Sequence, residues 1–197
     1  ARLYPGSYVD NPDWVSIVNE RHCERIEGYV TEAAERGTRI ETFGGPFEGP
    51  RERRLPLRLA IDPPTDTRIM QEEIFGPALV LLTYERIEEA VAGINHRPRP
   101  LALYYFGKDS REARYVLDHT VSGGVSINDV AMHPALEDAP FGGIGDSGMG
   151  HYHGHEGFLE FSHARTVFKA GWFDPRRLIG MLPPYTDGKL ERLIDRA

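Results

Sequence analysis

The stretch between residues 78 and 128 alternates short apolar runs with segments of helical periodicity, and this pattern constrains the fold more than any other feature. The runs at Ala78–Tyr84 and Leu101–Phe106 are continuous, as is typical of strands buried on both faces of a sheet. A third short strand is predicted at Gly124–Asn128.

Helical segments fill the two intervals between these runs. The first interval carries apolar residues at helical spacing, namely Ile87, Ala90, Val91 and Ile94. The second begins with a capping box formed by Asp109 and Glu112, followed by the apolar residues Ala113, Val116 and Leu117. This order of strands and helices, with short connections, predicts right-handed crossovers and a parallel sheet. The fold class is therefore α/β.

A longer helix is predicted at residues 19–36, closer to the N-terminus. Its apolar stripe consists of Cys23, Ile26, Val30 and Ala33. Gly37 follows the last turn, where a glycine commonly ends a helix. A short strand is predicted at Leu57–Ile61, before the breaker Asp62-Pro63-Pro64.

Composition excludes several classes of protein. The chain has 197 residues, of which 40% are hydrophobic and 27% charged, as in a soluble globular protein. No apolar run approaches the ~18 residues of a membrane span. The formal net charge of −7 argues against non-specific nucleic-acid binding. We therefore expect neither a nucleic-acid partner nor a membrane span.

The number of cysteines bears on the cellular compartment of the protein, and the N-terminal residues bear on whether the chain is part of a longer protein. Cys23 is the only cysteine, so an intrachain disulfide and a cysteine metal cage are excluded. This suits a reducing compartment, and we expect a cytoplasmic protein. The sequence starts at Ala1 without a methionine or an apolar signal stretch, which indicates that the chain begins within a longer protein.

A glycine motif and a histidine cluster each have a functional and a structural interpretation. Gly143–Gly148 matches G-x-G-x-x-G, but no strand precedes it, so we expect a tight loop with positive φ rather than a pyrophosphate site. His151, His153 and His155, with Glu156 nearby, leave a metal-binding domain as an alternative. We expect a polar, hydrogen-bonded loop there and no metal.

Cys23 and the segment before residue 78 are the remaining candidates. Cys23 could act as a nucleophile, but its place on the apolar stripe favours a small buried side chain. Glu73 and Phe75 lie two residues apart in an extended loop and can point the same way. A carboxylate beside an aromatic ring could hold a ribose diol and a stacked planar ring. The structural alternative is a loop acid and a core phenylalanine.

Several motifs resemble the aldehyde dehydrogenase family, and they occur in the family's order. The first is Glu73-Ile74-Phe75-Gly76-Pro77. The later ones are Asn95–Tyr104, Ser122–Asp129, Pro140–Gly150 with Tyr152-His153-Gly154, and Phe161-Ser162-His163. They are similar to the class 3, fatty-aldehyde and coniferyl-aldehyde branch. The resemblance covers residues 1–170, and residues 171–197 form a C-terminal tail.

The resemblance implies part of a catalytic domain, with a mostly parallel sheet, crossover helices and a C-terminal oligomerisation segment. The nucleophilic cysteine, the general-base glutamate and the Rossmann domain would lie upstream, so this chain would hold no catalytic residue and be inactive alone. The cofactor would be NAD or NADP, bound by Glu73 and Phe75. Asn128, Asp129 and His133 would lie near the substrate funnel, with Phe141 shaping its floor.

The full-length protein would then oxidise an aromatic, coniferyl-type or long-chain aldehyde to its carboxylic acid. By the same resemblance it would form a homodimer or higher homo-oligomer, with Gly123–Ile127 close to the subunit interface. The alternative is a non-catalytic fragment whose only property is association.

Overall fold

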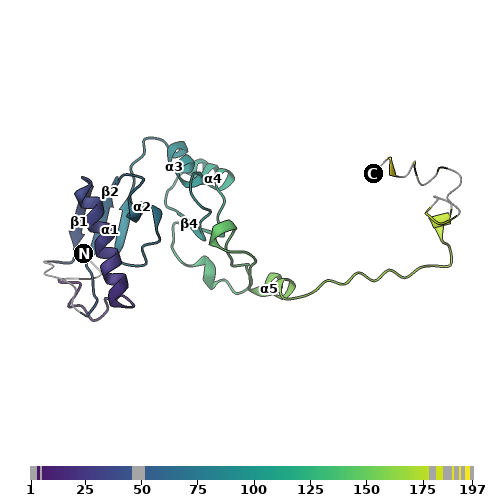
Figure 1. The fold of residues 1–197 in the computed structure, drawn as a ribbon, viewed down its shortest axis with the longest axis horizontal. Coiled ribbons are helices and arrows are strands. Elements are labelled where there is room, and N and C mark those ends of the chain that lie inside the picture. Colours follow the sequence, from purple (N-terminus) through teal and green to yellow (C-terminus); the bar gives the residue numbers. More distant parts are fainter. Residues whose placement is uncertain are drawn as a thin grey trace. The chain divides into compact units, whose positions relative to one another are not determined.

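The computed structural model describes residues 4, 6–45, 52–177, 181–183, 188, 191, 194 and 195. The chain forms two compact units (Figure 1). The first contains the residues up to Arg97 together with Asp118–Thr120, and the second contains Pro98–Leu117 and the residues from Val121 onward.

Helix α1, Glu20–Glu35, confirms the helix predicted at residues 19–36 and is one residue shorter at each end. The side chain of Asn19 caps its N-terminus by accepting a hydrogen bond from the backbone N–H of His22 at 3.0 Å. Gly37 follows the helix with a φ of 86°, a conformation that favours glycine. All residues of the predicted apolar stripe are buried, and Tyr29 is buried with them.

The first unit is built on a three-stranded sheet in the order β1-β2-β3. The strands are β1, Arg39–Phe43, β2, Leu57–Ile61, and β3, Ala78–Leu81. β1 pairs with β2 antiparallel, and β2 pairs with β3 parallel, with Ala60 opposite Val80. The short helix α2, Arg68–Gln71, lies between β2 and β3, and α3, Ile87–Asn95, follows β3.

Helices α1 and α2 bury one face of this sheet. The core combines Tyr29, Val30 and Ala33 of α1 with Ala60, Ile69 and Met70, and Ile40, Ile74, Ala78 and Val80 pack against it. A second cluster joins Ile17, Cys23, Ile26 and Leu55. The loop that leads into β3 therefore lies directly beside α1.

The second unit contains the β4-α4-β5 crossover. β4, Ala102–Tyr105, pairs parallel with β5, Gly124–Ile127, and α4, Ser110–His119, connects them. The Asp109 carboxylate caps α4 by accepting from the N–H groups of Arg111, at 2.8 Å, and Glu112, at 3.4 Å. The Glu112 carboxylate accepts a hydrogen bond from the hydroxyl of Tyr105 at 2.7 Å, which fastens α4 to β4.

The α/β class and the parallel pairings are confirmed, but the predicted single sheet is not what the structure shows. β3 pairs with β2, whereas β4 and β5 form a separate two-stranded sheet. The apolar runs have the character of strands covered on both faces, but in this chain part of the β3 surface is uncovered. In β3 the side chains of Leu79 and Leu81 are 56% and 44% exposed. A run of apolar residues indicates a strand that is covered on both faces in the complete fold. It does not show that the residues covering each face belong to this chain.

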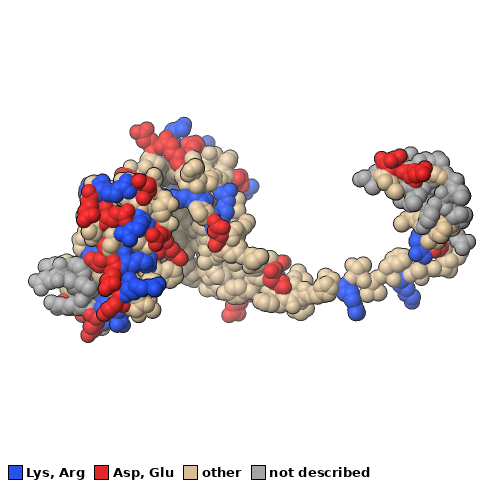
Figure 2. All heavy atoms as spheres, viewed as in Figure 1, with Lys and Arg blue, Asp and Glu red and all other residues tan. Residues whose placement is uncertain are grey.

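After β5 the elements of the described residues are short. These are the 3-10 turns His133–Ala135, Gly145–Ser147 and Pro175–Arg177 and helix α5, Gly154–Glu160. Part of the predicted 171–197 tail lies outside the described residues. Among the described residues, no helix has both the length and the apolar character needed to cross a bilayer. Figure 2 shows acidic and basic side chains intermixed over the first unit rather than gathered in one patch.

Candidate functional site

The loop of residues 72–77, between α2 and β3, presents both residues that the sequence singled out. The Glu73 side chain is exposed, and among the described residues its carboxylate has no hydrogen bond or ion pair. Phe75 is 75% exposed and has a φ of 51°, a left-handed conformation that is unusual for an aromatic residue. Ile74, between them, packs against the core. Phe75 is therefore not the core residue of the structural alternative.

The backbone of this 72–77 loop is held by Arg25 of α1. One terminal nitrogen, Nη1, donates to the carbonyl oxygen of Glu73 at 2.8 Å, and the other, Nη2, donates to that of Ile74 at 2.7 Å. Nη1 also donates to the hydroxyl of Tyr29 at 2.9 Å, and Nε donates to Nδ1 of His22 at 3.2 Å. The sequence does not mark Arg25 as a site residue, because its partners lie far along the chain.

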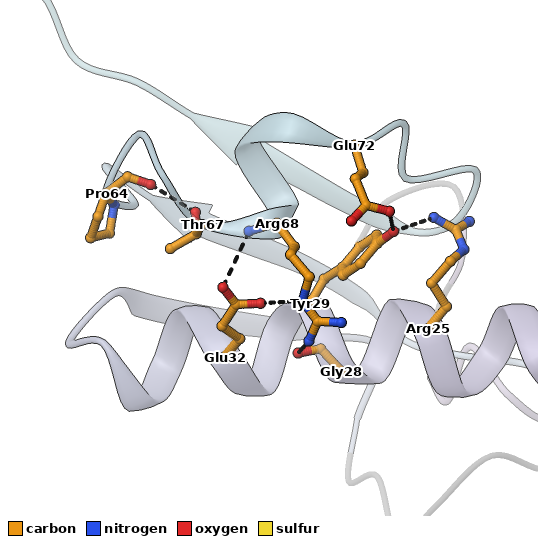
Figure 3. Close-up of polar contacts among 8 residues, drawn as sticks. All are labelled: Arg25, Gly28, Tyr29, Glu32, Pro64, Thr67, Arg68 and Glu72. Carbon is orange, nitrogen blue, oxygen red and sulfur yellow. Dashed lines mark hydrogen bonds and ion pairs between the residues drawn. The ribbon is translucent and has the colours of Figure 1, made fainter.

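Tyr29, which is buried, and Glu72, which is exposed, support this contact between α1 and the loop (Figure 3). The Tyr29 hydroxyl donates to the Glu72 carboxylate while it accepts from Arg25. The Arg25 and Arg68 guanidinium groups both lie over the Tyr29 ring, at 5.1 and 5.3 Å from its centroid. Arg68, however, binds Glu32 and the Gly28 carbonyl of α1 rather than the 72–77 loop.

In the second unit, Asn128 follows β5 and fixes a neighbouring turn. Its side-chain oxygen accepts from the Gly107 N–H at 2.9 Å, and its side-chain nitrogen donates to the Gly107 carbonyl at 3.0 Å. Asn128 has a φ of 57° and lines a shallow depression of about 340 Å³ beside α4, with Lys108 and Leu117. The Asp129 carboxylate is exposed and accepts a hydrogen bond from the N–H of Val130 at 2.7 Å.

His133 and Phe141 lie together in a cluster of rings. Nδ1 of His133 lies 3.0 Å from the hydroxyl of Ser126 on β5. The His133 ring is 5.9 Å from Tyr104 and 5.8 Å from Phe141, and Phe141 stacks at 6.3 Å on His153. The structure thus brings His133 and Phe141 into one half-buried aromatic wall, whereas Asn128 and Asp129 lie at the end of β5.

The glycine motif forms a tight loop around a 3-10 turn, with positive φ at Gly145 and Gly148, which confirms the structural interpretation. The nearby histidines take separate partners. Nε2 of His151 is 3.5 Å from the Glu156 carboxylate, and His155 stacks on Phe158. Within the described part of the chain, no three His, Cys, Asp or Glu side chains are grouped as metal ligands.

Cys23 is buried in α1, as its position on the apolar stripe predicts. Its Sγ lies 3.7 Å from the carbonyl oxygen of Arg53. Burial, followed by the nearby charge of Glu20, raises the pKa of the Cys23 thiol above its ordinary value. A buried thiol with a raised pKa is a poor nucleophile, so the structural interpretation of Cys23 is favoured.

Comparison with known proteins identifies the family to which these features correspond. The sequence model of the aldehyde dehydrogenase family matches residues 3–167 of this chain. A Pseudomonas aeruginosa protein named probable coniferyl aldehyde dehydrogenase is 51% identical over 176 residues, which are 89% of this chain and 36% of that protein.

Solved structures agree with the sequence match. A substrate-bound state of Staphylococcus aureus AldH aligns with a TM-score of 0.73 and 35% identity, over 99% of this chain and 41% of that one. A Mycobacterium tuberculosis aldehyde dehydrogenase complexed with NAD+ aligns with a TM-score of 0.70 and 29% identity, over 81% of this chain and 32% of that one. The chain spans little more than a third of the curated relatives that it matches.

Proposed function

The chain belongs to the aldehyde dehydrogenase family, and on this premise we propose that it is the C-terminal part of an enzyme that oxidises a coniferyl-type aromatic aldehyde to its carboxylic acid. The observation that carries the proposal is the 72–77 loop, which presents the exposed ring of Phe75 and the exposed carboxylate of Glu73, unpaired within the described part of the chain. The match to a relative named for coniferyl aldehyde favours an aromatic substrate over a long-chain one.

The residues of the loop suit a nicotinamide cofactor, NAD or NADP. The Glu73 carboxylate can accept hydrogen bonds from ribose hydroxyls, and charge-assisted bonds of this kind are stronger than neutral ones. The Phe75 ring can pack beside a planar heterocycle. When bound, the cofactor supplies the acceptor for the hydride that leaves the aldehyde carbon. In this proposal Glu73 and Phe75 bind and orient the cofactor, and they exchange no proton with the substrate.

The second unit supplies the candidate substrate funnel. His133 and Phe141, with Tyr104, form a half-buried wall of rings that suits an aromatic aldehyde better than a flexible chain. Asn128 and Asp129 lie just after β5, and Asn128 holds the adjoining turn through Gly107. We propose that Asn128, Asp129, His133 and Phe141 line the funnel.

The remaining chemistry belongs to residues outside this chain. We propose that the nucleophilic cysteine and the general-base glutamate lie upstream and that this chain alone is inactive. Cys23 does not replace the nucleophile, because it is buried and its thiol pKa is raised. We further propose a cytoplasmic enzyme, consistent with a free buried thiol, and a homo-oligomer with Gly123–Ile127 near its interface.

The test is an assay of the full-length protein with coniferyl aldehyde and with a long-chain aliphatic aldehyde, each with NAD+ and with NADP+. We expect aldehyde-dependent formation of reduced nicotinamide, with a higher kcat/KM for the aromatic aldehyde. A higher kcat/KM for the aliphatic aldehyde would refute the substrate assignment. No turnover of either aldehyde by a folded full-length protein would refute the enzymatic proposal and favour an association module.

A further inference from the structure

We propose that Arg25 is a positioning residue for the 72–77 loop, and that it holds Glu73 and Phe75 in the orientation that binds the cofactor. This inference rests on the proposed function of those two residues. Arg25 itself lies on α1, and its recorded contacts with the loop are to backbone oxygens rather than to either functional side chain.

The two carbonyl contacts act on the dihedral angles that aim the side chains. The Ile74 carbonyl and the Phe75 N–H belong to one planar peptide unit. A hydrogen bond that fixes this carbonyl therefore fixes the plane from which the φ of Phe75, 51°, is measured. The Glu73 carbonyl fixes the preceding plane in the same way. Arg25 thus restrains the peptide planes on both sides of Ile74.

The strained conformation of Phe75 needs such a restraint. A left-handed φ is costly for a residue with a large side chain, and it persists only where the surroundings enforce it. The side chain of Ile74 supplies an apolar anchor in the core, and Arg25 supplies the polar one. Together they turn the residues on either side of Ile74 toward the solvent.

The chemistry of the site is specific to a guanidinium. Its planar fork directs several N–H groups at once, so Nη1 and Nη2 reach consecutive carbonyls while Nη1 also reaches Tyr29. The Tyr29 hydroxyl in turn donates to the Glu72 carboxylate, and the Tyr29 ring lies beneath the Arg25 guanidinium. A lysine ammonium is a compact charge that lacks this planar fork, so it cannot hold both carbonyls in the same geometry.

Arg68 provides a matched control. It is also an arginine beside the Tyr29 ring, at 5.3 Å from the centroid, but it bonds to Glu32 and Gly28 of α1. Arg68→Ala removes the same kind of side chain from the same ring and leaves the loop carbonyls bonded. A general loss of packing would affect both variants, whereas a positioning role belongs to Arg25 alone.

The experiment compares Arg25→Ala, Arg25→Lys and Arg68→Ala in the full-length protein. Hydrogen–deuterium exchange of the cofactor-free protein reports on the loop directly, and calorimetric titration with NAD+ or NADP+ reports on affinity. We expect both Arg25 variants to speed exchange in peptides spanning residues 72–78 and to weaken cofactor binding. For Arg25→Ala the loss should be about tenfold or more, as for a hydrogen-bonded charge. The KM for the aldehyde should stay unchanged, and free guanidinium should partly restore Arg25→Ala.

Arg68→Ala should match the wild type in exchange and in cofactor affinity. If the Arg25 variants also match the wild type in loop exchange, or if Arg68→Ala weakens cofactor binding as much as Arg25→Ala, the positioning role is refuted. If Arg25→Ala does not fold, Arg25→Lys, which keeps the charge, decides by the same criteria. Unchanged cofactor affinity in Phe75→Ala together with an unchanged hydride-transfer rate in Glu73→Gln would instead refute the proposed function of the loop, while the exchange data would still show whether Arg25 restrains it.

Discussion

Arg58, in β2, forms an ion pair with Glu27 of α1 across the interface between helix and sheet. Only 9% of the Arg58 side chain is exposed, whereas 32% of the Glu27 side chain is. A nearly buried guanidinium is costly without a counter-charge, so Glu27 balances a charge that the sheet itself cannot solvate. The pair also joins α1, which carries Arg25, to the sheet that the 72–77 loop enters.

Glu27→Ala should therefore lower the free energy of unfolding by about 1–3 kcal/mol, because it removes a carboxylate that pairs with the nearly buried Arg58 guanidinium. Urea denaturation of the full-length protein, followed by circular dichroism, measures the change. Glu24→Ala is the matched control, since Glu24 is exposed on the same helix. Equal destabilisation by the two variants would show that the ion pair contributes nothing beyond helix propensity.

Glu73→Gln should slow hydride transfer in the full-length enzyme more than it weakens overall cofactor binding. The side chain would hold one ribose, and losing a charged hydrogen bond costs about 1.5–3 kcal/mol, roughly tenfold to a hundredfold in rate. Single-turnover kinetics with deuterated aldehyde measures the step.

Glu88→Gln, on the exposed side of α3, controls for the loss of one surface charge. A hydride-transfer rate and a turnover number equal to wild type in Glu73→Gln would remove Glu73 from the cofactor site.

Phe75→Gly should separate function from stability. Glycine adopts the φ of 51° at that position without strain, and the ring that is lost is 75% exposed, so we expect unchanged or slightly higher stability, by up to about 1 kcal/mol. Cofactor affinity should fall at the same time, because the aromatic surface is gone. Thermal unfolding and NAD+ titration of the full-length protein measure the two effects. Marked destabilisation would indicate that Phe75 serves the fold instead.

The pH dependence of stability should include a contribution from Asp109. Backbone N–H groups of Arg111 and then Glu112 donate to its carboxylate and lower its pKa in the folded state. The stabilisation is therefore fully present above the unfolded-state pKa, about 3.9, and is lost as the pH falls through the lower folded-state value. Asp109→Asn keeps a hydrogen-bond acceptor at the N-terminus of α4 but removes the titrating carboxylate. As the pH is lowered below about 4, the urea midpoint of this variant should therefore fall less than that of the wild type. Identical pH profiles would contradict the assignment.

Local patterns in the sequence were sufficient to predict most of the secondary structure. The stripe that begins at Cys23, the glycine that follows the helix at Gly37 and the strand Leu57–Ile61 all depend on neighbours within a few residues, and all are confirmed. The alternating order of strands and helices predicts a single parallel sheet, because a crossover connection commonly joins parallel strands of one sheet. The pairing partner of β3 depends on packing between segments that are distant in the sequence, and local periodicity does not predict such packing.

The candidate site divides in the same way. Glu73 and Phe75 could be predicted because a short motif contains both of them. Arg25 could not, since its contacts join α1 to residues nearly fifty positions later and nothing around it marks an arginine that binds carbonyls. The ring cluster of His133 and Phe141 likewise arises from the path of the chain after β5.

The isolated 197-residue chain should associate with copies of itself. On the exposed side of β3, Leu79 is 56% and Leu81 44% exposed, and Ile127 at the end of β5 is 48% exposed. Apolar strand faces of this kind are normally covered, and exposed patches of more than a few hundred Å² mark association surfaces. Light scattering across a dilution series should show a mass that rises with concentration, and Leu79→Lys should reduce that rise by placing a charge on the patch. A monomer at every concentration would show that the chain stays soluble with these faces uncovered, and self-association of this chain would then have to be abandoned.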